Sequence, residues 1–176
     1  MRSLRPHFLA LLVALALTAT AAHAALAVTK SAVQPDGNAM KAIRHYRATT
    51  LTRHRVMGHR VRFRKLRRVS LEHARKVWRR RAVATRRRFV QGPPHKSAWL
   101  CIHRYEGAWS DSGSPYYGGL QMDISFQASY GRPLLMAKGT AENWTPLEQM
   151  WVAERAYRAG RGFYPWPNTA RNCGLI

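Results

Sequence analysis

The chain has 176 residues, of which 46% are hydrophobic, and its 30 Lys and Arg against 8 Asp and Glu give a formal net charge of +22. This length allows one ordinary domain with additional segments. The sequence has no C-x-x-C, H-E-x-x-H or phosphate-binding-loop motif and no serine-protease or Cys-His signature. These absences argue against common metal, nucleotide and nucleophilic-protease sites, so we expect no metal and no cofactor.

Residues 1–24 are predicted to be a secretory signal peptide. Arg2 and Arg5 precede an apolar run at 8–17, and small residues then lead to an A-x-A site at 22–24. This order is typical of cleaved export signals. An uncleaved membrane anchor over 8–27 is the alternative, because that stretch is just long enough to span a bilayer. In both cases we expect an exported protein, either secreted or membrane-anchored.

Residues 25–96 are predicted to form a basic segment that is helical or disordered. Between 41 and 96 there are twenty Lys and Arg and one acid, Glu72. Apolar residues near helical spacing predict an amphipathic helix over about 71–89, with Ser70 as N-cap and weaker helix before it. A Gly-Pro-Pro linker at 92–94 ends the segment.

The charge of this basic segment indicates an anionic partner. In an exported chain we expect anionic wall polymers or lipid head groups, and the export signal argues against nucleic acid. A solvated, partly disordered spacer without a partner is the alternative interpretation.

Residues 97–176 are predicted to form a small domain in which seven basic and six acidic residues nearly balance. A domain of this size buries limited apolar surface, so a covalent cross-link adds materially to its stability. Cys101 and Cys173 are the two cysteines of the chain and lie near the two ends of this domain. In an exported protein this pair predicts a disulfide, with two free buried thiols as the alternative.

The first half of this domain is predicted to hold two helices and an irregular connection. One helix covers 97–106. A second, shorter helix lies between Asp123 as its N-cap and Gly131 as its C-terminal stop. Residues 113–121 are expected to form a short hairpin or an irregular loop. The domain is therefore predicted to be mainly α, with little or no sheet.

The stretch TPLEQMWVAERAYRAG gives the clearest helix signal in the chain. Thr145 is the predicted N-cap, Glu148 completes a capping box, and Gly160 is expected to end the helix. Glu154 lies on its largely apolar stretch, so we expect a structural salt bridge or hydrogen bond from it rather than chemistry. Trp166, between two prolines, is expected to close the domain against the first helix.

Glu106 is the candidate catalytic residue. Cleaving a glycosidic bond requires a carboxylic acid that keeps its proton until the leaving oxygen needs it, and apolar surroundings favour that protonated form. Glu106 lies at the predicted end of the first helix, with several aromatic residues close in sequence. Asp111 is the nearest candidate for a second carboxylate. A surface glutamate paired with Arg104 is the alternative.

Four motifs in this region, EGAW, YYGGLQM, EQMWVAERA and a WP pair ahead of the late cysteine, resemble the catalytic domain of resuscitation-promoting factors. These are transglycosylase-like bacterial proteins with a lysozyme-like fold that act on peptidoglycan. The resemblance covers 97–176 and implies an α+β lysozyme-like fold, Glu106 as catalytic acid, and a Cys101–Cys173 disulfide. The expected glycan-contacting residues are Trp109, Tyr116, Tyr117, Gln121 and Trp144.

The resemblance implies a wall-associated, peptidoglycan-cleaving glycoside hydrolase or lytic transglycosylase, which we expect to act as a monomer. Two other functions stay open at this stage. One is a wall-glycan-binding module without turnover, and the other is a cationic protein that acts at anionic surfaces through its basic segment.

Overall fold

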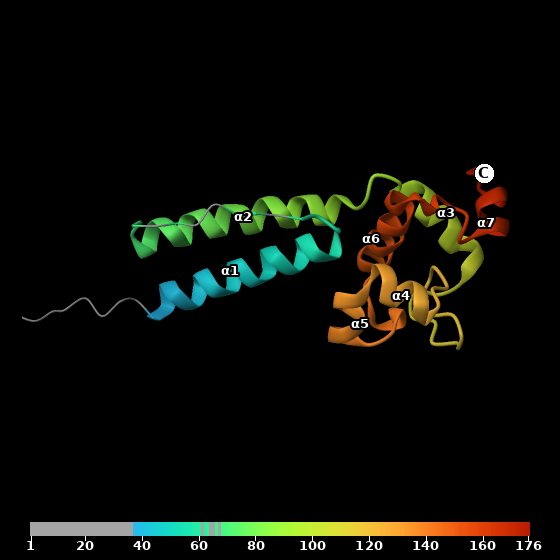
Figure 1. Cartoon of the computed structure of the whole chain (residues 1–176), viewed down its shortest axis with the longest axis horizontal. Coiled ribbons are helices and arrows are strands. Elements are labelled where there is room, and N and C mark those ends of the chain that lie inside the picture. The colour runs from blue at the N-terminus through green and yellow to red at the C-terminus, as the bar shows by residue number, and fades with distance from the viewer. Residues whose placement is uncertain (1–36, 61, 64–65, 67) are drawn as a thin grey trace, which may run out of the picture. The chain divides into compact units, whose positions relative to one another are not determined.

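The computed structural model describes residues 37–60, 62–63, 66 and 68–176 (Figure 1). The predicted signal peptide and the alternative membrane anchor lie outside the described residues. The described chain is mainly helical, as predicted, and its pairing of extended backbone is confined to one isolated antiparallel bridge between Tyr117 and Met122. None of its helices is both long and apolar enough to cross a bilayer.

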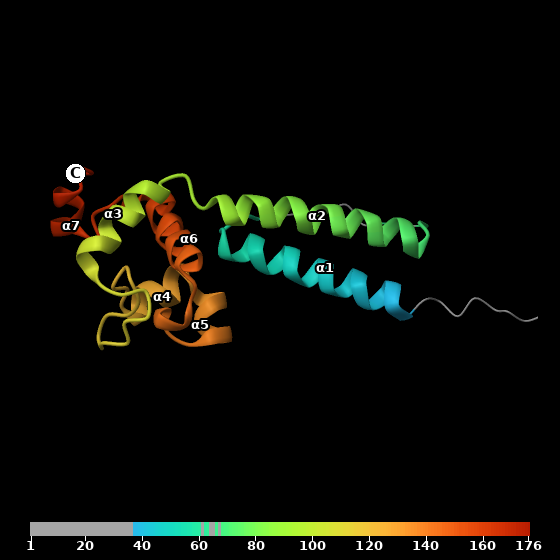
Figure 2. The ribbon, with the colours of Figure 1, turned by 180° about the vertical axis from the view of Figure 1, so that it is seen from behind.

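The basic segment contains two long helices, α1 (Gly37–Val56) and α2 (Leu71–Gln91), which lie side by side in both views (Figures 1 and 2). The predicted N-cap of α2 is confirmed, because the Ser70 side chain accepts a hydrogen bond from the amide of His73. Thr85 Oγ1 of α2 lies 3.2 Å from His54 Nε2 of α1, and this contact links the two helices.

The C-terminal region consists of short helices around α6. They are α3 (Lys96–Glu106), α4 (Ile124–Tyr130), α5 (Arg132–Lys138), the 3-10 turn η1 (Ala141–Asn143), α6 (Pro146–Ala156), the π-helical turn η2 (Tyr157–Arg161) and α7 (Pro167–Asn172). The predicted cap of α4 is confirmed, because Asp123 Oδ1 accepts from the amide of Phe126 at 2.6 Å. The predicted capping box of α6, between Thr145 and Glu148, is also present.

Helix α6 is the centre of the core. Seven of its eleven residues are buried: Gln149, Met150, Trp151, Val152, Ala153, Glu154 and Ala156. The α-helix ends at Ala156, four residues before the predicted stop at Gly160, because the chain widens into the turn η2. Gly160 lies in that turn with φ of 90°, a conformation that glycine adopts at little cost.

The basic segment packs on α6 through specific contacts. Trp151 Nε1 donates to the carbonyl of Phe89 at 3.1 Å. The two rings are nearly parallel, with an interplanar angle of 20° and centroids 6.5 Å apart. Arg158 Nη2 donates to the carbonyl of Met57 at 2.6 Å, and Met57 is fully buried in the same hydrophobic core. The first helix pair and the C-terminal region thus share one core.

Candidate functional site

Glu106 is the last residue of α3, and its side chain is half-buried. The helix packs into the core through Trp99 and Ile102, both completely buried. Gly107 follows as the C-cap, and its amide donates to the carbonyl of His103 at 3.4 Å. Burial of Trp99 and Ile102 therefore fixes the position of the Glu106 carboxylate at the end of α3, and the chain turns away at the next residue.

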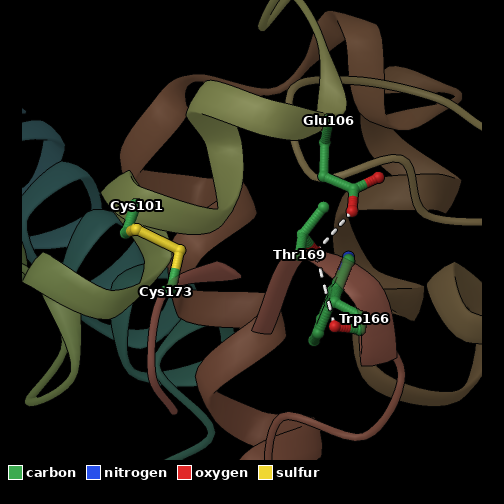
Figure 3. The surroundings of a disulfide bond; sticks show 5 residues. All are labelled: Cys101, Glu106, Trp166, Thr169 and Cys173. Atoms are coloured by element: carbon green, nitrogen blue, oxygen red, sulfur yellow. Dashed lines mark hydrogen bonds between the residues drawn. A yellow bond between two sulfur atoms is a disulfide. The ribbon is translucent and has the colours of Figure 1, made fainter. Parts of the chain in front are cut away.

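The carboxylate of Glu106 is held by Thr169, a residue of α7 (Figure 3). Thr169 Oγ1 lies 2.7 Å from Glu106 Oε1 and 3.3 Å from the carbonyl oxygen of Trp166. A hydroxyl group has one hydrogen, so it donates to one of these oxygens at a time. It can donate to an ionised Glu106, or accept the proton of a neutral Glu106 while it donates to Trp166.

The predicted disulfide is confirmed between Cys101 of α3 and Cys173, directly after α7, with an Sγ–Sγ distance of 2.08 Å. It joins the same two helices as the contact between Glu106 and Thr169 (Figure 3). Cys101 lies five residues before Glu106, and Cys173 lies four residues after Thr169. The cross-link and the hydrogen bond therefore hold α7 against α3 at two points about one helical turn apart.

Asp111 and Gln121 organise the loop that follows Glu106. Asp111 Oδ1 accepts from the amide of Gly113 at 2.9 Å, and Asp111 Oδ2 accepts from Gln121 Nε2 at 2.9 Å. Gln121 Nε2 also donates to the carbonyl of Gly118 at 2.9 Å. Both oxygens of Asp111 thus have partners within the loop, and a role as second carboxylate stays a prediction. In the described residues Gln121 Oε1 has no hydrogen-bond partner and can accept from a ligand.

Trp109 is half-buried and stacks on the ring of His103, with centroids 3.9 Å apart and planes inclined by 22°. His103 Nδ1 in turn lies 3.0 Å from the carbonyl oxygen of Gly119. A Cβ at Gly119 would lie 2.6 Å from that ring nitrogen and 2.7 Å from Trp109 Cε3. The loop can therefore approach this stacked pair only because residue 119 lacks a side chain.

The two tyrosines differ in exposure, as the alternation of an extended chain predicts. Tyr116 is exposed, with 50% of its surface accessible, whereas Tyr117 is less accessible and packs against the core. Tyr117 also forms both backbone hydrogen bonds of the bridge with Met122. Tyr116 is thus the tyrosine that offers a ring to a ligand.

The expectation that Trp144 adds a stacking surface is wrong. Its side chain is 2% exposed, and Nε1 donates to the carbonyl of Gly139 at 2.8 Å. The ring lies so close to Gly131 that a Cβ there would be 2.5 Å from Cη2. The segment between α4 and α6 folds into α5 and η1, which turns this tryptophan into the core rather than toward a ligand.

Two buried polar side chains of α6 hold the surrounding segments. Glu154 accepts from Trp99 Nε1 at 3.0 Å and lies 3.2 Å from His95 Nδ1, which confirms its predicted structural role. Gln149 was not anticipated from the sequence. Its Nε2 lies within donor distance of the carbonyl oxygens of Trp109 and Ala141, at 2.8 and 2.9 Å. It thereby ties the loop after Glu106 to the core helix.

Trp166 closes the domain against α3, as predicted. Its ring packs edge-on against Trp99 with centroids 5.2 Å apart. Its Nε1 donates to the carbonyl of Leu120 at 2.6 Å. Trp166 therefore positions both the start of α7, which carries Thr169, and the loop that carries Gln121.

Thr169 is the functional candidate that the sequence analysis missed. A usable signal was present, because the predicted disulfide places the helix ending in Glu106 beside the segment before Cys173. About one helical turn from each cysteine, the chain reaches Glu106 on one side of this pair and Thr169 on the other.

No protein-family model matches the chain, and no curated protein and no solved structure is significantly similar to it. Within the residues that the structure describes, no three His, Cys, Asp or Glu side chains gather to form a metal site.

Proposed function

We propose that this protein is an exported enzyme that cleaves the glycan strands of peptidoglycan, with Glu106 as its single catalytic acid. The observation that carries the proposal is the hydrogen bond between Glu106 and Thr169, whose hydroxyl can serve both protonation states of the carboxylate. The exposed ring of Tyr116 and the unpartnered Gln121 Oε1 support it, because aromatic rings and amides are common contacts for sugars. The resemblance of the motifs to resuscitation-promoting factors supports the same assignment and a lysozyme-like arrangement of the domain.

In the proposed reaction, Glu106 donates its proton to the glycosidic oxygen between N-acetylmuramic acid and N-acetylglucosamine. The carbon–oxygen bond breaks, the electron pair stays with the leaving oxygen, and positive charge develops on the sugar ring. A hydroxyl group of the sugar itself or a water molecule then adds to the ring carbon and returns a proton to Glu106. Thr169 stabilises the carboxylate in the interval by donating its hydroxyl hydrogen.

The basic segment is proposed to hold the enzyme on anionic polymers of the wall. This role requires no contact with Glu106, because α1 and α2 pack on α6 whereas Glu106 lies at the end of α3. We propose that the enzyme acts as a secreted monomer that the segment keeps near its substrate.

The test is mass spectrometry of the soluble products after the full chain has been incubated with purified peptidoglycan. We expect muropeptides from the wild type and none from Glu106→Gln. Anhydro end groups would identify a lytic transglycosylase, and reducing end groups a hydrolase. Turnover by Glu106→Gln at the wild-type rate would refute the assignment.

Thr169 gives a second, matched pair of variants. Thr169→Val keeps the shape but removes the hydrogen bond, and we expect turnover to fall about tenfold, as the loss of a hydrogen bond to a charged group predicts. Thr169→Ser keeps the hydroxyl and should stay close to wild type. Equal turnover by both variants would show that Thr169 has no role in the reaction.

A wall-glycan-binding module without turnover is the second candidate. The observation that favours it is that both oxygens of Asp111 accept hydrogen bonds within their own loop, which gives this carboxylate a structural role in place of one that assists Glu106. This candidate predicts glycan binding without products and an unchanged affinity for Glu106→Gln.

A further inference from the structure

One side of α2 carries a row of exposed basic side chains, which we call the arginine face: Lys76, Arg79, Arg80, Arg86 and Arg87. With 3.6 residues per turn, these positions fall on one side of the helix over successive turns. The opposite side packs against α1 and the core, where Ala82 and Thr85 are buried. The arginine face is therefore directed away from the helix with which α2 pairs.

No acidic side chain in the described chain neutralises the arginine face beyond its first turn. Glu72, the single acid between 41 and 96, is held by Arg75 at 2.7 and 2.9 Å and lies 3.7 Å from Lys76. Among the described residues no salt bridge reaches the four arginines of the face. Like charges three and four residues apart destabilise a helix, so an external anion bound along the face would relieve this repulsion.

We propose that the arginine face binds a linear polymer that carries repeated phosphate groups. The planar guanidinium matches a phosphate with two parallel hydrogen bonds. The basic side chains extend over about 16 Å of helix, at 1.5 Å per residue, so they can bind several phosphate groups at once rather than one.

The apolar content of this side favours a polymer over a lipid surface. Its exposed apolar side chains are Val83 and Val90, each 54% exposed. Helices that lie in a membrane interface insert larger side chains such as Leu, Phe and Trp. Two valines among arginines provide contact area for a flexible chain but a weak anchor in a bilayer.

The aromatic residues of α2 argue against single-stranded nucleic acid as the polymer. Proteins that bind single strands stack the bases on exposed aromatic rings. Trp78 instead packs against Phe63, with centroids 5.2 Å apart, and beneath the guanidinium of Arg81 at 4.7 Å. Phe89 stacks on Trp151. Neither ring belongs to the arginine face, so the fit is to a sugar-phosphate or polyol-phosphate chain without bases.

This inference deepens the anchoring role in the proposed function, but it does not depend on catalysis. Binding to the polymer uses α2 alone, whereas turnover uses Glu106. The Glu106→Gln chain must therefore bind the polymer as the wild type does, and failure of one proposal leaves the other intact.

The experiment measures the affinity of the full chain for long-chain inorganic polyphosphate at a series of NaCl concentrations. The slope of log Kobs against log[NaCl] reports the number of phosphate contacts. Replacing Arg79, Arg80, Arg86 and Arg87 together by Gln should reduce its magnitude by roughly 3, because each contact contributes roughly 0.7 on a single strand. The control replaces four exposed arginines elsewhere in the segment, at the same change in net charge: Arg44, Arg47, Arg55 and Arg60.

We expect the control variant to change the slope by less than about 1, because arginines that do not contact a phosphate release few counterions from the polymer. Equal losses in both variants would overturn the proposal, since net charge would then explain the binding. It would also be overturned if random-sequence single-stranded DNA of equal charge bound more than about tenfold tighter. Anionic vesicles that bind and resist displacement by polyphosphate would overturn it in favour of a lipid surface.

Folding of the variant is checked separately. Gln has a helix propensity close to that of Arg, so far-UV circular dichroism should be unchanged. A further variant with Lys at the same four positions keeps the charge and should retain most of the slope. Loss of the slope in a folded Lys variant would contradict a phosphate-binding face.

Discussion

Removing the disulfide tests how α7 and its Thr169 are held against α3. Changing Cys101 and Cys173 to Ser opens a loop with a sequence separation of 72 residues. In the chain-entropy model, a closure of this length is worth about 4 kcal/mol of stability, before any native strain is subtracted. The total free energy of unfolding of a small domain is about 5–15 kcal/mol, so this loss would be a large fraction of it.

The loss should be concentrated at α7. That helix has six residues, too few to be stable by itself, and outside the disulfide it is held by buried Ala170, the Trp166 hydrogen bond to Leu120 and the Thr169 contact with Glu106. Without the cross-link, α7 should detach before the core around α6 unfolds. The proposed active site would then lose Thr169 while most of the helices persist.

Urea denaturation, followed by circular dichroism and tryptophan fluorescence, measures this effect. We expect the double variant to lose about 2–4 kcal/mol of unfolding free energy. Reductant should destabilise the wild type by a similar amount and leave the variant unchanged, which is the internal control. A difference below about 1 kcal/mol would refute the reasoning, because it would mean that noncovalent contacts alone hold the long loop closed.

Two further predictions concern the packing of the loop and of the helix pair. Gly119→Ala places a Cβ 2.6 Å from His103 Nδ1, and we expect thermal unfolding to show a loss of about 1–3 kcal/mol of unfolding free energy. The control is Gly37→Ala, whose Cβ has no atom within 4 Å and should cost almost nothing. Burial lowers the pKa of His54 below its ordinary value of 6.5, and the positive charge of Arg88 lowers it further. The pKa of His59 is also lowered, first by burial and then by nearby positive charges. The unfolded chain therefore takes up these protons first as the pH falls, and stability should decrease below about pH 6.5 but not change between pH 7.5 and 8.5. Chemical denaturation in chloride buffers checks this, with a His54→Gln/His59→Gln variant as the control; an equally steep decrease in that variant would assign the effect to other groups.

The starts of α2, α4 and α6 could be predicted because their signals are local. Ser70, Asp123 and the Thr145–Glu148 box each satisfy backbone amides within three residues, so the sequence alone specifies them. The disulfide was predictable for a different reason, since a chain with two cysteines allows one intramolecular pairing, and the predicted export signal favours its oxidation. The three caps are local and form wherever their helices lie in space, whereas the disulfide also requires α7 to lie beside α3.

The parts that could not be predicted depend on distant contacts. Trp144 was expected at the surface because nothing near it in sequence shows that α5 and η1 turn it inward onto Gly131. The importance of Gln149 follows from carbonyl groups of Trp109 and Ala141, which come close only after the chain has folded. Only weaker helix was expected before residue 71, and the contact of His54 with Thr85 of α2, which helps to hold α1, forms only after the chain has folded.

The hydrogen-bond partners of the carboxylates distinguish Glu106 from every other described acid. A catalytic acid must gain and lose a proton without breaking the fold around it. Elsewhere each carboxylate accepts from at least one group that can only donate, such as a guanidinium, an amide or an ammonium group, so a proton on the accepting oxygen would remove that hydrogen bond. These are Glu72, Asp111, Asp123, Glu142, Glu148 and Glu154. Glu106 has Thr169 as its partner, and a hydroxyl can reverse its direction as the proton leaves. That reversal favours Glu106 as the acid.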